Sequence, residues 1–127
     1  MVLHPSLIAV VDDEESVRLA LTRLLRASAY EVVAFDSGES FLSSLQQIRL
    51  PDCVILDFQM PGMSGGDVQR ALFMSKLRLP IIIVTAHDQA TLRDRCVANG
   101  AAAYFSKPLR GAQLLPAIGA ALQHHNR

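Results

Sequence analysis

Several residue types are scarce or missing in this sequence, and each absence excludes a class of protein. There is no tryptophan, and aromatic residues make up only 6% of the 127 residues, so a core must be mostly aliphatic. The two cysteines, Cys53 and Cys96, are far apart and lack metal-ligand spacing, which predicts free thiols in a reducing compartment. Acidic and basic residues balance at 12 each without a basic stripe, so we expect no direct contact with nucleic acid.

Long hydrophobic runs are also missing. The apolar runs 7–11 and 81–84 have the length of strands and are too short to span a membrane. The first residues lack the basic region of a signal peptide, and acidic residues arrive by Asp12. We therefore expect a cytoplasmic protein without membrane association, and the length fits one domain over residues 1–127.

What the sequence does have is a regular alternation of strand and helix signals. Short aliphatic runs predict strands at 7–11, 31–35, 53–57, 81–85 and 103–105. Helical spacing and capping residues predict helices at about 15–29, 64–75, 88–99 and 110–123, and another from an N-cap at Asp36 to about Gln47. This order is typical of an α/β fold with a parallel sheet covered by helices on both faces. We expect four phenylalanines to pack in or near the core: Phe35, Phe41, Phe73 and Phe105.

Chemically active side chains follow the strands at the point where each strand ends. Asp12 and Asp13 follow the first strand, Asp57 ends the third, Thr85 ends the fourth and Lys107 follows the fifth. Each alone has an ordinary explanation, such as a carboxylate favouring a helix N-terminus. Together they converge on one edge of a parallel sheet, where such folds bind ligands. Three carboxylates repel one another, so we expect a hard divalent cation there, Mg²⁺ or Mn²⁺, and raised carboxylate pKa values without it.

A carboxylate beside a metal ion can hold a phosphoryl group as an acyl phosphate. The transferring group spreads its charge over three oxygens. The cation would neutralise one oxygen, Thr85 would donate to a second and Lys107 would pair with a third, so catalysis would be positioning and electrostatics. These residue types predict a phosphoryl acceptor, with Asp57, Thr85 and Lys107 as its catalytic residues.

The sequence resembles the receiver domain of two-component response regulators over nearly its whole length. Among these domains it most resembles the FixJ-like subgroup. The motifs that carry the resemblance are Val10-Val11-Asp12-Asp13-Glu14, Val54-Ile55-Leu56-Asp57, Met60-Pro61-Gly62-Met63-Ser64-Gly65, Ile83-Val84-Thr85-Ala86, and Gly100-Ala101 through Lys107-Pro108. The resemblance implies a flavodoxin-like sheet of five parallel strands in the order 2-1-3-4-5. It also implies a regulatory domain, not a conventional enzyme, that catalyses its own phosphorylation and dephosphorylation.

The resemblance also assigns roles to individual residues. Asp57 would be phosphorylated by a sensor histidine kinase, and the metal would be held by Asp12, Asp13, Asp57 and the backbone carbonyl of Gln59. Thr85 and Tyr104 match the switch pair, and the peptide bond between Lys107 and Pro108 would be cis. The output face would be the fourth helix, fifth strand and fifth helix, and phosphorylation would favour a homodimer and control transcription through an output domain. FixJ-like receivers usually precede a helix-turn-helix output domain, so the chain is either an excised domain or a stand-alone receiver.

Three other classes of protein were weighed against this interpretation. Phosphatases of the haloacid-dehalogenase type need a second aspartate two residues after the nucleophile, where this sequence has Gln59. A nucleotide- or flavin-binding module would need a loop rich in glycine or hydroxyls after the first strand, where Asp12 and Asp13 would instead repel phosphate. A protein-interaction module with an inactive site would not need the acidic cluster together with Thr85 and Lys107, so their joint presence argues against this class.

Overall fold

The computed structural model describes residues 5–46 and 49–125, and it has the predicted alternation of strands and helices. The strands are β1 (Leu7–Val11), β2 (Glu31–Phe35), β3 (Cys53–Asp57), β4 (Ile81–Thr85) and β5 (Ala103–Ser106). The helices are α1 (Glu15–Ala27), α2 (Gly38–Ser44), α3 (Gly65–Met74), α4 (Ala90–Ala98) and α5 (Gly111–His125). The strands form one parallel sheet in the order β2-β1-β3-β4-β5, which confirms the predicted α/β fold and strand order.

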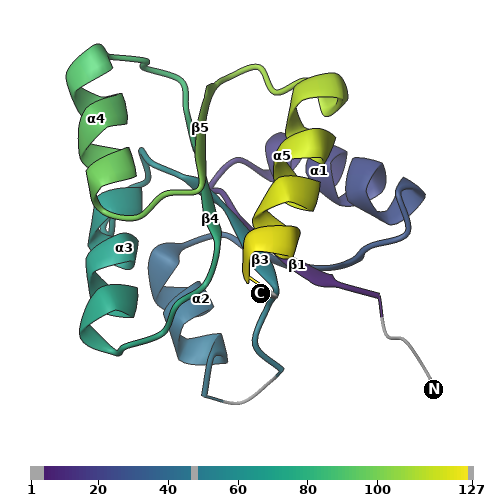
Figure 1. The fold of residues 1–127 in the computed structure, drawn as a ribbon, viewed down its shortest axis with the longest axis horizontal. Helices are drawn as coiled ribbons and strands as arrows, with labels where there is room; N and C mark the ends of the chain where they lie inside the picture. The colour runs from purple at the N-terminus through teal and green to yellow at the C-terminus, as the bar shows by residue number, and fades with distance from the viewer. Residues whose placement is uncertain (1–4, 47–48, 126–127) are drawn as a thin grey trace.

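Both faces of the sheet are covered, with α1 and α5 on one side and α2, α3 and α4 on the other (Figure 1). Successive residues of a strand point to opposite faces, so one strand serves both cores. In β1, Ile8 and Val10 pack with α1 and α5, whereas Ala9 and Val11 pack with α2, α3 and α4. This double burial explains why the central strands are continuous aliphatic runs. Within the described residues, every helix is too short or too polar to span a bilayer.

The ends of several helices differ from the prediction. The N-cap of α2 is Ser37, whose hydroxyl accepts a hydrogen bond from the Ser40 backbone amide, so the prediction of Asp36 was wrong. α2 ends at Ser44, and the predicted end at Gln47 lies outside the described residues. α4 begins two residues after Asp88. Local capping, which depends on backbone angles, decides these boundaries and is poorly visible in a sequence.

Phe73 contradicts the expectation that all four phenylalanines lie in or near the core. Phe41 is fully buried, and Phe35 and Phe105 are partly buried against the two cores, but Phe73 is 79% exposed. On α3 the buried stripe contains Leu72, and the next residue along a helix lies about 100° further round the axis. Phe73 therefore points away from the sheet.

The cysteines are free, as predicted, and both are buried. Burial raises the pKa of the Cys53 thiol to about 12, so this group stays protonated and unreactive at neutral pH.

Candidate functional site at the carboxyl edge of the sheet

Three carboxylates lie together where β1 and β3 end. One oxygen each of Asp12, Asp13 and Asp57 lies within 4.8 Å of the other two. Asp12 and Asp57 are each only 3% exposed, whereas Asp13 is exposed to solvent. The neighbouring strands β1 and β3 pair Val11 with Leu56, so the residues that follow them emerge side by side. The predicted acidic cluster is therefore present.

Lys107 reaches the cluster from the loop after β5. Its Nζ lies 2.9 Å from Asp12 Oδ2, 3.5 Å from Asp57 Oδ1 and 3.4 Å from Glu14 Oε1. Burial alone would lower the pKa of Lys107, but the hydrogen bond to Asp12 and the other carboxylates raise it above its ordinary value. The lysine is therefore a fixed cation beside the carboxylates. The peptide bond between Lys107 and Pro108 is cis, as the resemblance implied.

The Asp57 carboxyl is a weaker acid than an ordinary aspartate. Burial, followed by the repulsion of Asp12, raises its pKa from 3.8 to about 7, although Lys107 and the Gln59 backbone amide oppose the change. A further cation beside this carboxyl would favour its ionised form. The donor set around it consists of oxygen atoms only, which suits a hard cation such as Mg²⁺ and excludes a soft thiolate-type metal site.

Thr85 and Tyr104 lie on the same face of the sheet, on the neighbouring strands β4 and β5. Ile83 pairs with Tyr104 and Thr85 pairs with Ser106, so Thr85 is two residues beyond the partner of Tyr104. Thr85 is fully buried, and its hydroxyl accepts from the His87 backbone amide at 3.1 Å. The hydroxyl is therefore held by the loop that leads to α4.

The Tyr104 ring is 8% exposed, and the Arg93 guanidinium of α4 lies 5.2 Å from its centroid. Its hydroxyl is buried without a hydrogen-bond partner among the described residues. Burial, and then the neighbouring Asp88 carboxylate, raise the pKa of this hydroxyl, so it stays neutral. A buried hydroxyl without a hydrogen-bond partner is uncommon in folded proteins, which marks Tyr104 as a residue of interest beside Thr85.

Two contacts of the site were missed by the sequence analysis. The Glu14 carboxylate pairs with Lys107, and the Arg18 guanidinium donates to the Asp12 backbone carbonyl at 2.7 Å. Glu14 lies in the acidic motif and was a visible candidate, but Arg18 is an ordinary helix residue by its sequence. The position of the Gln59 carbonyl relative to the cluster stays a prediction.

The loop after Asp57 is held close to α3 by a glycine. The Gly65 amide donates to the Phe58 carbonyl at 2.8 Å, and a Cβ at Gly65 would lie 2.8 Å from the Phe58 Cα. Only glycine allows this approach of two backbones. Ser64 and Asp67 then form a reciprocal capping box at the start of α3. The loop that joins β3 to α3 is therefore fixed immediately after Asp57.

A five-stranded parallel sheet with an acidic cluster and a lysine at its carboxyl edge defines a receiver-type signalling module. The family model described as response regulator receiver domain matches residues 8–119 of this chain. The chain therefore belongs to the response regulator receiver domain family, whose members are phosphoacceptor regulatory domains of two-component signalling.

Similar proteins agree with this membership. The chain is 37% identical over 125 residues to Nodulation protein W of Bradyrhizobium diazoefficiens, covering 96% of this chain and 53% of that protein. It is 39% identical over 118 residues to the response regulator protein TmoT of Ectopseudomonas mendocina, covering 93% of this chain and 53% of that protein. The chain thus spans about half the length of these relatives. The crystal structure of FixJ-N superimposes with a TM-score of 0.86 at 30% identity, covering 96% of this chain and 97% of FixJ-N.

Proposed function

We propose that residues 1–127 form one receiver domain that accepts a phosphoryl group on Asp57 from a sensor histidine kinase, in the cytoplasm. The observation that carries the proposal is the nearly buried Asp57 carboxylate, which lies with Asp12 and Asp13 in one cluster and within 3.5 Å of the Lys107 ammonium. One carboxylate oxygen forms the new bond to phosphorus as the bond from phosphorus to the donor nitrogen breaks. The electron pair of that bond leaves with the donor histidine, which is protonated from solvent.

The residues around Asp57 have separate roles in this proposal. Lys107 holds an oxygen of the transferring group, and Thr85 donates to another after its hydroxyl leaves the His87 backbone amide. Asp12, Asp13, Asp57 and the Gln59 carbonyl would hold Mg²⁺ or Mn²⁺. When bound, the cation supplies charge neutralisation for the phosphoryl oxygens and for the clustered carboxylates. The domain would thereby promote its own phosphorylation and dephosphorylation.

The test of this function is labelling with a small acyl phosphate, followed by intact mass. We expect one phosphoryl group per chain in the presence of Mg²⁺ and none in excess chelator, because the carboxylates otherwise repel the donor. Equal labelling with and without the metal would contradict the proposed mechanism. Absence of labelling in both conditions would favour an interaction module with an inactive site.

Mg²⁺ should stabilise the folded domain, because the three carboxylates are brought together only in the folded state. At a hundredfold excess of Mg²⁺ over its dissociation constant, we expect the free energy of unfolding to rise by about 2.7 kcal/mol. Thermal melts of the parent and Asp13→Asn measure this gain, most of which the variant should lose. Asp36→Asn, which changes an exposed carboxylate after β2, should keep the gain. An equal gain in Asp13→Asn and the parent would remove Asp13 from the site.

We further propose that phosphorylation is transmitted to the α4–β5–α5 face through Thr85 and Tyr104. The proposal rests on their position on one face of the sheet and on the unpaired Tyr104 hydroxyl. Movement of the Thr85 hydroxyl towards the phosphoryl group would open space for the tyrosine ring, and the new packing would favour a homodimer or an output partner. The transcriptional regulators among the relatives make transcription the proposed output, through a domain outside these residues.

Removal of either switch residue should uncouple phosphorylation from dimerisation. Couplings of this kind are worth about 1–3 kcal/mol, so we expect Thr85→Ala and Tyr104→Ala to reduce the phosphorylation-dependent gain in dimer affinity by at least about fivefold. Sedimentation of phosphorylated and unphosphorylated protein measures the gain. Ser106→Ala removes an exposed hydroxyl opposite Thr85 in the sheet and is the matched control. Unchanged coupling in both switch variants would refute this route.

A further inference from the structure

α3 carries two large apolar side chains that face solvent. Phe73 is 79% exposed and its neighbour Met74 is 74% exposed, and they exceed every other exposed large hydrophobic residue in the described part of the chain. Single exposed apolar residues are common on protein surfaces, but an adjacent pair with this exposure forms a patch. Neither side chain contributes to the phosphoacceptor site at the opposite end of the sheet.

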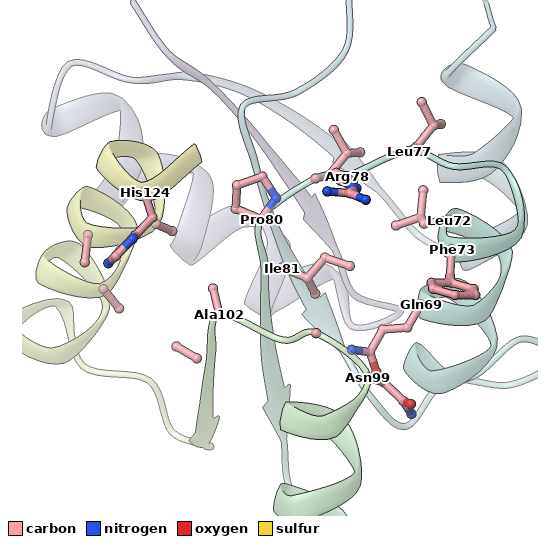
Figure 2. A pocket seen from close by; sticks show the side chains of 16 residues that line it. Gln69, Leu72, Phe73, Leu77, Arg78, Pro80, Ile81, Asn99, Ala102 and His124 are labelled. Atoms are coloured by element: carbon pink, nitrogen blue, oxygen red, sulfur yellow. The ribbon is translucent and has the colours of Figure 1, made fainter. Parts of the chain in front are cut away.

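Phe73 lines two cavities that lie on either side of it on α3. One, of about 590 Å³, lies among α3, the first residues of β4 and β5, and α5. Figure 2 shows its walls, with Phe73 and Gln69 on one side and His124 of α5 on the other. The second, of about 800 Å³, lies between α3 and α4. Because Gln69, Phe73 and Asn99 line both cavities, the two adjoin along α3, and we call the pair the α3 groove.

The floor of the α3 groove contains an unsatisfied hydrogen-bond acceptor. Gln69 is only 4% exposed, and its Nε2 donates to the Cys96 carbonyl of α4 at 3.3 Å. Its Oε1 has no partner among the described residues. An unpaired buried acceptor destabilises a protein, so an occupant of the groove that brings a donor to this oxygen would be favoured over one that does not. The floor therefore selects an occupant with an N–H group.

The charged side chains that line the groove are mostly cationic. Arg70 and Arg95 border the cavity between α3 and α4, and Arg78 borders the other cavity. The one carboxylate among these lining residues is Asp67, which accepts the Ser64 amide at 2.9 Å in the capping box and lies 3.8 Å from the Arg70 guanidinium, so the three arginines exceed the carboxylate by two charges. The whole chain has zero net charge, so this cationic excess is local. It attracts an acidic partner and opposes association with the same groove of a second copy.

We propose that the α3 groove is a docking site for an acidic amphipathic helix of a partner protein. The apolar face of that helix packs against Phe73 and Met74, its carboxylates face the three arginines, and one amide side chain donates to Gln69 Oε1. Helices are recognised in grooves by this combination of apolar anchors and flanking charge. An anionic lipid surface would also suit the cations and the two apolar side chains, but acyl chains provide no donor for the recessed glutamine.

The probe is a fluorescein-labelled synthetic helix about five turns long, with leucine, phenylalanine and one asparagine on one face and glutamate on the other. Two control peptides are compared with it. In one, every glutamate is replaced by lysine, and in the other the same residues are in scrambled order. Anisotropy is measured on the full chain without metal or phosphodonor, so the result is independent of the phosphoacceptor site. We expect the acidic amphipathic helix to bind at least about tenfold tighter than either control peptide.

Variants then locate the binding site. Phe73→Ala should weaken binding at least about tenfold without changing the thermal melt, because the side chain is exposed. The double variant Arg70→Glu, Arg95→Glu should reverse the preference, so that the lysine control peptide binds tighter than the acidic helix. Leu19→Ala removes an apolar side chain that is 48% exposed on α1 and should have no effect. Absent binding, equal binding of the three peptides, or binding insensitive to Phe73→Ala would overturn the proposal.

Two further measurements separate the rival occupants. Cosedimentation with vesicles of phosphatidylglycerol and phosphatidylcholine tests a membrane surface, and sedimentation of the protein alone tests a second copy. We expect that the protein does not bind the vesicles through Phe73 and does not self-associate through Phe73. Loss of vesicle binding or of self-association in Phe73→Ala would assign the groove to a membrane or to a homodimer and would overturn the proposal of a partner helix.

Discussion

Asp57→Asn is expected to lower phosphoryl uptake from a small acyl phosphate by at least about a thousandfold. The amide has almost the same shape as the carboxyl group, so the fold should be retained, but its oxygen is a poor nucleophile. Asp12 and Asp13 are not expected to replace it, because Asp12 is held by Lys107 and the Glu14 backbone amide and Asp13 is exposed. Intact mass after incubation with the phosphodonor and Mg²⁺ measures the uptake.

The matched control for this variant is Asp36→Asn, an exposed carboxylate at the end of β2 that does not belong to the acidic cluster. It should be phosphorylated like the parent. Undiminished phosphorylation of Asp57→Asn would show that another residue accepts the group and would remove the basis of the proposed mechanism.

The stability of the metal-free domain should fall as pH rises, because Asp57 is harder to ionise in the folded state. Its pKa is about 7 when folded, against about 3.9 for an aspartate in an unfolded chain. The folded state therefore binds more protons between these values, and stability is lost from the lower pKa through the upper one and stays low above it. One pKa unit corresponds to about 1.4 kcal/mol, so the contribution between about pH 5 and pH 8 is about 2–3 kcal/mol.

Other groups also titrate over this range, so the informative quantity is the difference between the parent and Asp57→Asn. Denaturant unfolding in chelator should show the variant gaining about 2–3 kcal/mol relative to the parent on going from about pH 5 to pH 8. Asp94→Asn, which changes an exposed carboxylate on α4, should follow the parent. A pH dependence that is identical in Asp57→Asn and the parent would mean that the Asp57 carboxyl is not strained in the empty site.

The fold was largely predictable because a strand that is buried on both faces of the sheet is a continuous aliphatic run, which can be recognised in the sequence. β1, β2, β3 and β4 have the predicted bounds, since each run stops at a polar or turn residue. The helix ends were less predictable, because the choice of Ser37 over Asp36 as N-cap depends on which side chain faces the Ser40 amide. The exposure of Phe73 could not be predicted from composition, because it depends on which stripe of α3 faces the sheet.

The members of the site were predictable for a different reason. Parallel strands end at one edge, so polar residues that follow the neighbouring central strands come close to one another, whereas Asp36 after the edge strand β2 stays outside the cluster. The distances were not predictable, because they depend on how residues far apart in the sequence are brought together. The ammonium of Lys107 lies 2.9 Å from Asp12 and 3.5 Å from Asp57, and the raised pKa of Asp57 comes from its burial and from the repulsion of Asp12, which Lys107 opposes. Arg18 carried no sequence signal, because its contact is with a backbone carbonyl.

The most direct test of the account is to identify the residue that carries the phosphoryl group. The parent protein is incubated with a small acyl phosphate and Mg²⁺, the acyl phosphate is reduced with borohydride, and the digested peptides are sequenced by mass spectrometry. Reduction converts a phosphorylated aspartate to homoserine and leaves free carboxylates unchanged. We expect homoserine at position 57 and at no other position. Homoserine at Asp12 or Asp13, or a phosphoryl group that survives on another type of side chain, would contradict it.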